Sequence, residues 1–362
     1  MAEATGKNPY TRLVEKAFAE AIPLSAQFEI TYRCNHLCTF CYNSPTGARE
    51  LTTPQIFEAL RKVSEFGVLY LTLTGGEPLC HRDFFAIAGE ARRLGMALRI
   101  YSNGYLMADP EVARKIAALK PMEVEISLHG SRPEIHEALT KIKGSFEKTV
   151  RGIRNLRESG IKVPLKCPIT RLNQDDLFPV RDLADELGCH LTFDAVITPK
   201  DDGNLDPLAL RPGEEFLSKY WGEWYLELHH GKLPPKSNHC ASDAAEAVCG
   251  SGRSGFTLDP YGNIFPCVAF RRRVANILEI DSLEQIWKTS PVLTGVRDLA
   301  IQARSRLDQH ENGPYFTFCM GVAETQVGSP LAMYPQAEIN AKAVRRSYEL
   351  LQVGEAAARK IP

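Results

Sequence analysis

The first 230 residues repeat one pattern, in which a short apolar segment is followed by an amphipathic segment of helical period. The apolar segments predict strands and the amphipathic segments predict helices. The expected strands are 26–32, 67–74, 97–103, 122–129, 162–169 and 190–197, and the expected helices are 53–66, 82–94, 109–119, 145–159, 174–188 and 213–229. Successive strand–helix units with short connections predict a parallel sheet, either open or curled into a partial barrel.

The expected strands alternate in polarity, although strands of a parallel sheet covered by helices are usually apolar throughout. In strand 122–129, Val124 and Ile126 share one face, and Glu123, Glu125 and Ser127 share the other. Since helices are expected to cover the apolar face, the polar face is predicted to line a cavity that holds a ligand and water. A sheet with one solvent face is the alternative, but strand–helix crossovers normally cover both faces.

Three more polar residues, His129, Lys166 and Asp194, belong to this inward face. They are candidates for steering or deprotonating a substrate. An equally good interpretation is that they hold one another in place within a polar core.

Ten cysteines need an explanation in this chain of 362 residues. The amino terminus lacks the apolar core of a signal peptide, and no apolar run approaches the ~20 residues of a membrane helix, so we expect a cytoplasmic protein with no membrane partner. A net charge of −1 gives no sign of nucleic-acid binding. Cytosolic thiols stay reduced, and clustered cysteines therefore indicate metal binding or catalysis rather than disulfides.

Three of these cysteines, Cys34, Cys38 and Cys41, lie in a loop directly after the first expected strand. The carboxyl ends of parallel strands are where α/β folds place their active sites. Structural zinc normally takes four protein ligands, whereas three thiolates fit a [4Fe–4S] cluster with one iron free of protein. The spacing favours the cluster and leaves zinc open.

The segment around this triplet resembles the radical S-adenosylmethionine (SAM) enzymes, in which three cysteines at this spacing hold a cluster whose open iron binds SAM. The motifs "TGGEP" (74–78), "YSNG" (101–104) and "ISLHG" (126–130) follow in the family's order at the ends of successive strands. The resemblance covers residues 25–200 and implies a partial (β/α)6 barrel of the TIM type. It also implies an enzyme that uses a 5′-deoxyadenosyl radical to abstract hydrogen from its substrate.

The resemblance assigns six residues to SAM binding: Phe40, Gly75, Gly76, Glu77, Asn103 and Ser127. Phe40 matches the apolar position that packs against adenine, and Glu77 is expected to accept hydrogen bonds from the SAM amino group. The two glycines are expected to let the backbone approach the ligand closely. The electron is expected from a donor such as flavodoxin or ferredoxin.

After residue 230 the strand–helix pattern stops. A linker-like segment with two prolines precedes a hairpin predicted in 255–267, a short helix near 282–289, irregular sequence to 335 and a final helix near 336–357. The predicted segments are thus an extension (1–24), the barrel (25–230), a cysteine-bearing domain (231–335) and a C-terminal helix (336–362). We expect the cysteine-bearing domain, poor in apolar periodicity, to need a metal for folding. The basic run 271–273 is expected to be a solvated loop.

The later cysteines resemble those of the SPASM domain, an iron–sulfur extension of radical SAM enzymes, through Cys249-x12-Gly262-x4-Cys267, "SLEQIW" and "FCMG". A complete SPASM domain holds two auxiliary clusters. Here only Cys319 remains of its last cysteine block, with His310, Gly313 and Ala323 at the other places. The resemblance therefore implies a twitch-like domain with one auxiliary [4Fe–4S] cluster on Cys240, Cys249, Cys267 and Cys319. His310 is the alternative to Cys319 as a ligand, and zinc is the alternative metal.

Three cysteines stand alone in the sequence. Cys167 and Cys189 are expected to be small buried apolar residues. Cys80 follows the Gly-Gly-Glu turn, and a hydrogen-donor role, as in some peptide epimerases, is a secondary hypothesis.

Enzymes with similar architecture mostly crosslink or epimerise ribosomally made peptides, and this is the predicted function. The alternative is a small-molecule substrate such as a tetrapyrrole or a sugar. A non-enzymatic iron–sulfur electron carrier is disfavoured, because a carrier has no use for an open iron and a SAM pocket. Only about 25 residues precede the first expected strand, too few for a leader-binding domain with its own core. A peptide substrate is thus expected to use a separate leader-binding protein or the cavity rim.

Overall fold

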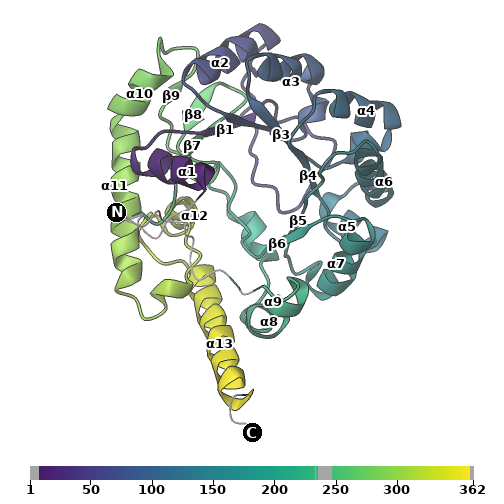
Figure 1. Ribbon diagram of the computed structural model, residues 1–362, viewed down its shortest axis with the longest axis vertical. Helices are drawn as coiled ribbons and strands as arrows, with labels where there is room; N and C mark the ends of the chain where they lie inside the picture. The colour runs from purple at the N-terminus through teal and green to yellow at the C-terminus, as the bar shows by residue number, and fades with distance from the viewer. Residues whose placement is uncertain (1–7, 233, 235–246, 359–362) are drawn as a thin grey trace.

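The computed structural model describes residues 8–232, 234 and 247–358 (Figure 1). Its strands form one sheet in the order β6-β5-β4-β3-β2-β1-β7-β8-β9. The first six are parallel and run in sequence: β1 (Ser25–Glu29), β2 (Tyr70–Thr74), β3 (Ala97–Ser102), β4 (Glu123–Ser127), β5 (Leu165–Pro168) and β6 (Leu191–Asp194). Since the sheet order begins at β6 and ends at β9, the curved sheet is open, and the predicted partial barrel is confirmed.

Helices cover the outer face of this sheet (Figure 1). Five lie where the sequence predicts them: α2 (Thr53–Glu65), α3 (Phe84–Arg93), α4 (Pro110–Ala118), α6 (Ser145–Glu158) and α7 (Leu177–Glu186). The expected helix 213–229 consists of α8 (Glu214–Lys219), a π-helical turn (Tyr220–Trp224) and α9 (Tyr225–Leu228). Helix α5 (Pro133–Thr140) was not predicted, although it begins with a proline in its first turn, as helices often do.

The two faces of the parallel strands differ as their sequences predict. On β4, Val124 and Ile126 are fully buried, whereas Glu123 and Glu125 on the other face are half-buried. The apolar side chains belong to the main hydrophobic core together with Ile56 of α2 and other helix residues. The polar face is therefore turned away from the helices and toward the concave side of the sheet.

The C-terminal region extends the same sheet. β7 (Gly255–Leu258) pairs in parallel with β1, and β8 (Asn263–Phe265) and β9 (Ala275–Asn276) follow in antiparallel order. The predicted hairpin is thus confirmed, and it adds to the barrel sheet beside β1. The short helix α10 (Leu283–Thr289) and the long helix α13 (Pro335–Ala358) also lie where expected.

The expectation of irregular sequence up to residue 335 was wrong. It contains α11 (Pro291–Asp308) and α12 (Met320–Val327). The signal for α11 was present, because its buried residues Leu293, Val296, Ala300, Ala303 and Leu307 recur at helical spacing behind a proline in the first turn.

A second hydrophobic core holds this region together. It contains Phe18 of α1 (Pro9–Ala19), Val296 of α11 and the buried aromatic residues Phe316 and Phe318. The indole of Trp287 donates a hydrogen bond to the carbonyl oxygen of Ala21 at 2.6 Å, which fastens the amino-terminal segment to α10. No helix in the described part of the chain combines the length and apolar character needed to cross a bilayer.

Candidate functional site

The three cysteines of the first group lie on one loop at the carboxyl end of β1. Cys34 is exposed, and Cys38 and Cys41 are half-buried. Burial, together with the charges of Glu77, Cys41 and Cys80, raises the pKa of Cys34 to about 11. Burial also raises the pKa of Cys38, and the two neighbouring thiols add to that shift. The thiols are close enough to repel one another as thiolates, so a bound cationic group would stabilise them.

The triplet supplies three thiols, one fewer than a tetrahedral zinc ion takes from protein. Tetrahedral zinc needs four ligands about 2.3 Å or less from one point. Within the described ranges, no three His, Cys, Asp or Glu side chains converge in this way. Three thiols spread around a loop fit the ligation of a [4Fe–4S] cluster.

Backbone hydrogen bonds hold this loop against two other parts of the chain, the end of α5 and the segment after β6. The amides of Leu37 and Thr39 donate to the carbonyl oxygens of Thr140 and Leu139 at the end of α5. The carbonyl oxygen of Tyr42 accepts from the amide of Asp201 at 2.8 Å. The cysteines are thereby held against the rim of the barrel.

The "TGGEP" turn packs against the chain that leads into Cys34. The amide of Gly76 donates to the carbonyl oxygen of Thr31 at 2.8 Å. A Cβ on Gly75 would overlap that same oxygen, and a Cβ on Gly76 would lie 2.6 Å from the carbonyl oxygens of Tyr32 and Arg33. Both glycines therefore let two segments of the protein's own backbone approach each other closely. The prediction from the sequence was that they let the backbone approach the ligand.

Glu77 connects this turn to the end of β3. Its buried carboxylate accepts hydrogen bonds from the hydroxyl of Ser102 at 2.9 Å and from the amide of Asn103 at 2.8 Å. Burial raises its pKa to about 7. The amide group of Asn103 in turn donates to Asn35 at 2.7 Å, so the structure brings Glu77 and Asn103 together beside Cys34.

Several buried polar atoms around the cysteine loop have no hydrogen-bond partner among the described residues. They are Asn35 Nδ2, Thr39 Oγ1, Asn43 Oδ1, Ser44 Oγ and His129 Nδ1. Buried polar atoms are nearly always paired. Their concentration here fits an additional polar group bound beside the cysteines.

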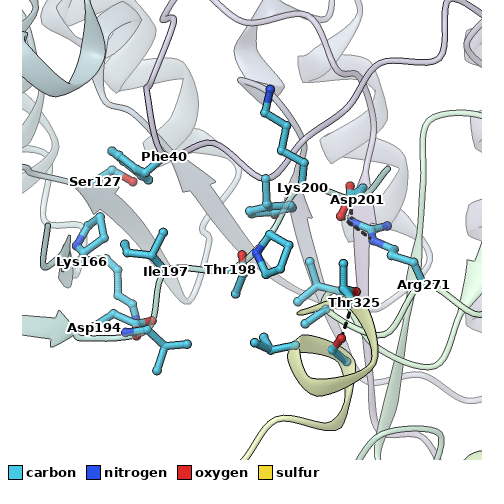
Figure 2. A pocket seen from close by; sticks show the side chains of 18 of the residues that line it. Phe40, Ser127, Lys166, Asp194, Ile197, Thr198, Lys200, Asp201, Arg271 and Thr325 are labelled. Atoms are coloured by element: carbon cyan, nitrogen blue, oxygen red, sulfur yellow. Dashed lines mark hydrogen bonds and ion pairs between the residues drawn. The ribbon is translucent and has the colours of Figure 1, made fainter. Parts of the chain in front are cut away.

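A cavity of about 330 Å³ adjoins the loop (Figure 2). Phe40 and Tyr42 of the loop line it, as do Ser127, His129, Lys166 and Asp194 at the ends of β4 to β6. The C-terminal region supplies another wall, with Val268, Ala269, Arg271, Gly321, Val322 and Thr325. The polar residues of the first wall were predicted from strand alternation. The second wall comes from the loop at 268–271 and from helix α12, and the sequence pattern does not reveal that these segments approach the barrel.

Two of the inward polar residues form an ion pair. Lys166 Nζ lies 3.2 Å from Asp194 Oδ2, and each side chain is more than one-third exposed, at 37% and 39%. The interpretation that the inward polar residues hold one another thus fits Lys166 and Asp194 but not His129, and both members of the pair also face the cavity (Figure 2).

His129 is packed among rings. It stacks on His136, with ring centres 5.2 Å apart, and meets Phe40 edge to face at 5.0 Å. Burial lowers its pKa to about 3, so the imidazole is neutral near pH 7. The packing of His129 holds the ring of Phe40 in place. Because its pKa is so low, His129 does not suit the role of a group that takes a proton from the substrate.

The expectation that 271–273 is a solvated loop was wrong for Arg271. Its guanidinium binds the fully buried Glu29 and also lies 3.0 Å from Asp201 (Figure 2). The hydroxyl of Tyr32 donates to Glu29 at 3.0 Å. A charge run gives no sign of such a partner, because Glu29 lies 242 residues away.

The second group of cysteines is partly brought together. Burial, together with the nearby Cys267, raises the pKa of Cys319 to about 11. Cys249 packs with both against the second core. Cys240 lies outside the described residues. His310 instead meets the ring of Phe316 at 4.9 Å.

The isolated cysteines differ in their surroundings. Cys167 and Cys189 are buried, as expected of small apolar residues. Cys80 is half-buried, and its pKa is raised by burial and by Glu77. Since Cys80 also raises the pKa of Cys34, it lies beside the first cysteine of the triplet.

Residues 28–177 match the model of the radical SAM superfamily. Mycofactocin maturase MftC of Mycolicibacterium smegmatis is 28% identical over 317 residues, which cover 81% of this chain and 78% of that protein. An AdoMet-dependent heme synthase of Methanosarcina barkeri is 26% identical over 306 residues, covering 76% and 85%. A PqqA peptide cyclase of Ruegeria pomeroyi is 27% identical over 258 residues, covering 68% of each.

The fold matches that of solved structures as well. The structure described as native anSMEcpe with bound AdoMet and Cp18Cys peptide superimposes with a TM-score of 0.68. The match covers 92% of this chain and 99% of the other, at 16% sequence identity. Barrel and C-terminal region therefore share one known architecture.

Proposed function

This chain contains a radical SAM domain, and on that premise we propose that it is an enzyme that abstracts hydrogen from a ribosomally made peptide, to crosslink or epimerise it. Two relatives support the peptide, one named as a maturase and one as a peptide cyclase. The observation that carries the proposal is the cavity, which places Phe40 of the cysteine loop and Ser127 of β4 in the same space as a wall from the C-terminal region.

The cofactors are assigned to named residues. Cys34, Cys38 and Cys41 would hold a [4Fe–4S] cluster, and Phe40, Gly75, Gly76, Glu77, Asn103 and Ser127 would contact SAM. When bound, the cluster supplies the electron that splits SAM into methionine and a 5′-deoxyadenosyl radical.

The chain's own residues prepare that site. His129 holds the ring of Phe40, and Asn35 orients the amide group of Asn103. Glu77 joins the "TGGEP" turn to the end of β3 by accepting a hydrogen bond from the amide of Asn103. Side chains that are already held by their neighbours rearrange little when a ligand binds. The free-energy cost of ordering them on binding is therefore small.

The size of the cavity bears on the substrate. About 330 Å³ is at the lower end of the range for pockets that enclose a whole small molecule. It suits a substrate that inserts one or two side chains while the rest stays outside. A tetrapyrrole is the second candidate, because the heme synthase relative is matched over 85% of its length. A larger macrocycle would require the wall at 268–271 to move.

We further propose one auxiliary [4Fe–4S] cluster on Cys240, Cys249, Cys267 and Cys319 in the region 231–335, which follows a barrel at 25–230. The electrostatic contact of Cys267 with Cys319 supports this set, and the engagement of His310 with Phe316 favours Cys319 over His310. A separate leader-binding protein and an external electron donor complete the proposed partners.

SAM cleavage tests the reaction class. Reconstituted, reduced enzyme is expected to release 5′-deoxyadenosine slowly without substrate, and Cys38→Ala is expected to abolish the release. Cys189→Ala is the matched control, because this buried cysteine precedes β6, at the end of the parallel strands opposite the cysteine loop. Cleavage that survives Cys38→Ala would contradict the assignment.

Mass spectrometry tests the substrate. Short peptides encoded beside the gene are expected to lose two hydrogens on crosslinking, or to gain deuterium from heavy water on epimerisation. Conversion of an iron-bound tetrapyrrole, with all such peptides unchanged, would favour the second candidate.

A further inference from the structure

Beyond the end of β6 the chain continues as a segment that lines the cavity (Figure 2). Residues 195–201 are called the cavity segment. Burial alternates along it with a period of two, so that Ile197 is buried while its neighbours Val196 and Thr198 are half-buried. This period indicates an extended backbone. Pro199 favours the same conformation, because a residue that precedes proline is restricted to the extended region.

Two hydrogen bonds hold the cavity segment in position. The guanidinium of Arg211 donates to the carbonyl oxygen of Ile197 at 2.7 Å. The amide of Asp201 donates to the carbonyl oxygen of Tyr42 at 2.8 Å. Since β6 is the first strand in the sheet order, the segment that follows it is fixed without being paired to another strand of the described sheet.

Between these two contacts the backbone has free hydrogen-bonding groups. In the described part of the chain, no group donates to the carbonyl oxygen of Val196, and neither the amide nor the carbonyl oxygen of Thr198 has a partner. Backbone groups that are withdrawn from water are nearly always paired in native proteins. A donor and two acceptors, two residues apart along an extended backbone, are what an open strand presents to a second strand.

One positive charge in the cavity is also unmatched. Lys166 and Arg271, the other two cationic side chains that line it, are paired with carboxylates. Lys200 lies at the end of the cavity segment, and within the described ranges no carboxylate is within ion-pair distance of its ammonium group. A half-buried charge is stabilised by an opposite charge, so this end of the cavity favours an anionic group.

We propose that the cavity segment docks the substrate peptide as an added strand, an inference that rests on the proposed function. An extended stretch of the peptide pairs its backbone with Val196 and Thr198, and a carboxylate of the peptide binds the ammonium group of Lys200. In this mode of recognition, backbone hydrogen bonds supply affinity and pockets for alternate side chains supply specificity. A tetrapyrrole can bring a carboxylate to Lys200, but it has no amide backbone to pair with Thr198.

N-methylation of the peptide tests the backbone pairing without changing the enzyme. The probe is the peptide encoded beside the gene that the enzyme converts or, where none is converted, the fragment of those peptides that binds most tightly. Methylation at two positions, two residues apart, is expected to raise the Kd measured by fluorescence anisotropy roughly fivefold or more, because each methyl group removes a donor to Val196 or Thr198. Methylation of the residue between them is expected to change the Kd less than about twofold, since its amide faces the other way. Equal effects at successive positions, or no effect at any position, would overturn the proposal.

A pair of enzyme variants tests the same hydrogen bonds from the other side. Thr198→Pro removes the amide donor and is expected to raise the peptide Kd roughly fivefold or more. Thr198→Val keeps the amide and the shape of the side chain, and its Kd is expected to stay within about twofold. Release of 5′-deoxyadenosine without peptide is expected to be unchanged in both variants, which shows that the barrel is intact. Equal losses of peptide affinity would assign the contact to the side chain and contradict the proposal. If Thr198→Pro fails to fold, the N-methylation pattern decides.

Lys200→Met tests the carboxylate. This change is expected to raise the peptide Kd roughly tenfold, as for loss of a hydrogen bond to a charged group. Lys120→Met is the matched control, because Lys120 precedes β4 at the opposite end of the parallel strands. Conversion of one acidic side chain of the peptide to its amide, or amidation of its C-terminus, is expected to cause the same loss in the parent and no further loss in Lys200→Met. Whichever change does so identifies the carboxylate as a side chain or the C-terminus. Loss of SAM cleavage in Lys200→Met without peptide would overturn this assignment, because Lys200 would then act on SAM.

Binding and turnover separate this inference from the proposed function. An alternating N-methylation pattern in a peptide that is never converted supports the docking and contradicts the proposed function. Conversion of a peptide that shows no such pattern supports the function and contradicts the docking. If no peptide binds and a tetrapyrrole does, both are wrong.

Discussion

Arg271 and Glu29 form a bidentate ion pair, with Nη2 2.8 Å from Oε1 and Nη1 3.0 Å from Oε2. Glu29 is the last residue of β1 and is fully buried, and Arg271 follows Cys267 by four residues. The pair therefore connects the strand before the first cysteine group to the turn that carries the second.

Arg271→Met is expected to destabilise the protein by about 3–5 kcal/mol, because it leaves the buried carboxylate of Glu29 and the half-buried carboxylate of Asp201 without their cation. Arg272→Met is the matched control, since Arg272 pairs with Glu324 where both are more than 30% exposed. Its cost is expected to stay below about 1 kcal/mol. Urea unfolding measures both values. Similar costs for the two variants would show that the Arg271 contact stabilises no more than a surface pair.

Iron content tests the number of clusters. Anaerobically reconstituted protein is expected to bind about eight irons, and the triple change of Cys34, Cys38 and Cys41 to Ala is expected to leave about four. Twelve irons would contradict a single auxiliary cluster. Stoichiometric zinc would contradict its metal assignment.

Gly76→Ala is expected to be strongly destabilising and to reduce cluster retention. Its Cβ would press on the carbonyl oxygens of Tyr32 and Arg33, backbone atoms that cannot move without shifting Cys34. Gly89→Ala in α3 meets nothing within 4 Å and is expected to stabilise by about 0.5–1 kcal/mol through helix propensity. Thermal unfolding and the cluster's visible absorbance, recorded together, check both expectations. Unchanged absorbance in Gly76→Ala would contradict the role given to this turn.

Glu77 makes stability depend on pH. Burial raises its pKa from the usual 4.5 to about 7, so between these values the folded state binds more protons than the unfolded state. Stability from this group is present at low pH and is lost as pH rises through 7, by roughly 3 kcal/mol in total. Glu77→Gln mimics the neutral carboxyl. Relative to the parent, Glu77→Gln is expected to lower the free energy of unfolding in urea by more at pH 5 than at pH 8. The reverse order would contradict the raised pKa of Glu77.

Cys267→Ala is expected to remove about four irons while the region after residue 247 keeps its resistance to trypsin. This region was expected from its sequence to need its metal for folding, whereas the second core, with Val296, Phe316 and Phe318, supplies apolar packing of its own. Cys189→Ala is expected to retain the full iron content. Rapid cleavage of Cys267→Ala within 247–335 would show that the metal, and not the core, holds this region.

The strand–helix repeat was predictable because it depends on local patterns. Alternation located β4 within two residues of its observed ends, and helix periodicity located α6 within one. α5 was missed because its eight residues are too short for a strong period. α11 was missed although its apolar spacing was visible.

The site was predictable where one motif carries it and unpredictable where distant segments meet. The cysteine loop and the "TGGEP" turn could be identified from a few adjacent letters. The partner of Arg271 and the cavity wall at 268–271 depend on how β7 joins the sheet, which no local pattern reports. The reason for Gly75 was also misjudged, because its crowding by Thr31 appears only in three dimensions.

The pairing of β7 with β1 has a consequence for the order of folding. On the ribosome, β1 ends at residue 29 and β7 begins at residue 255, so 226 residues must be added before this side of β1 is covered. At about 5–20 residues per second, the delay is roughly 10–45 s. During that time β1, an interior strand of the finished sheet, is an open edge, and such an edge can pair with strands of other chains. A fragment that stops at residue 230 would keep that edge permanently, so it is expected to aggregate even though every barrel strand is present.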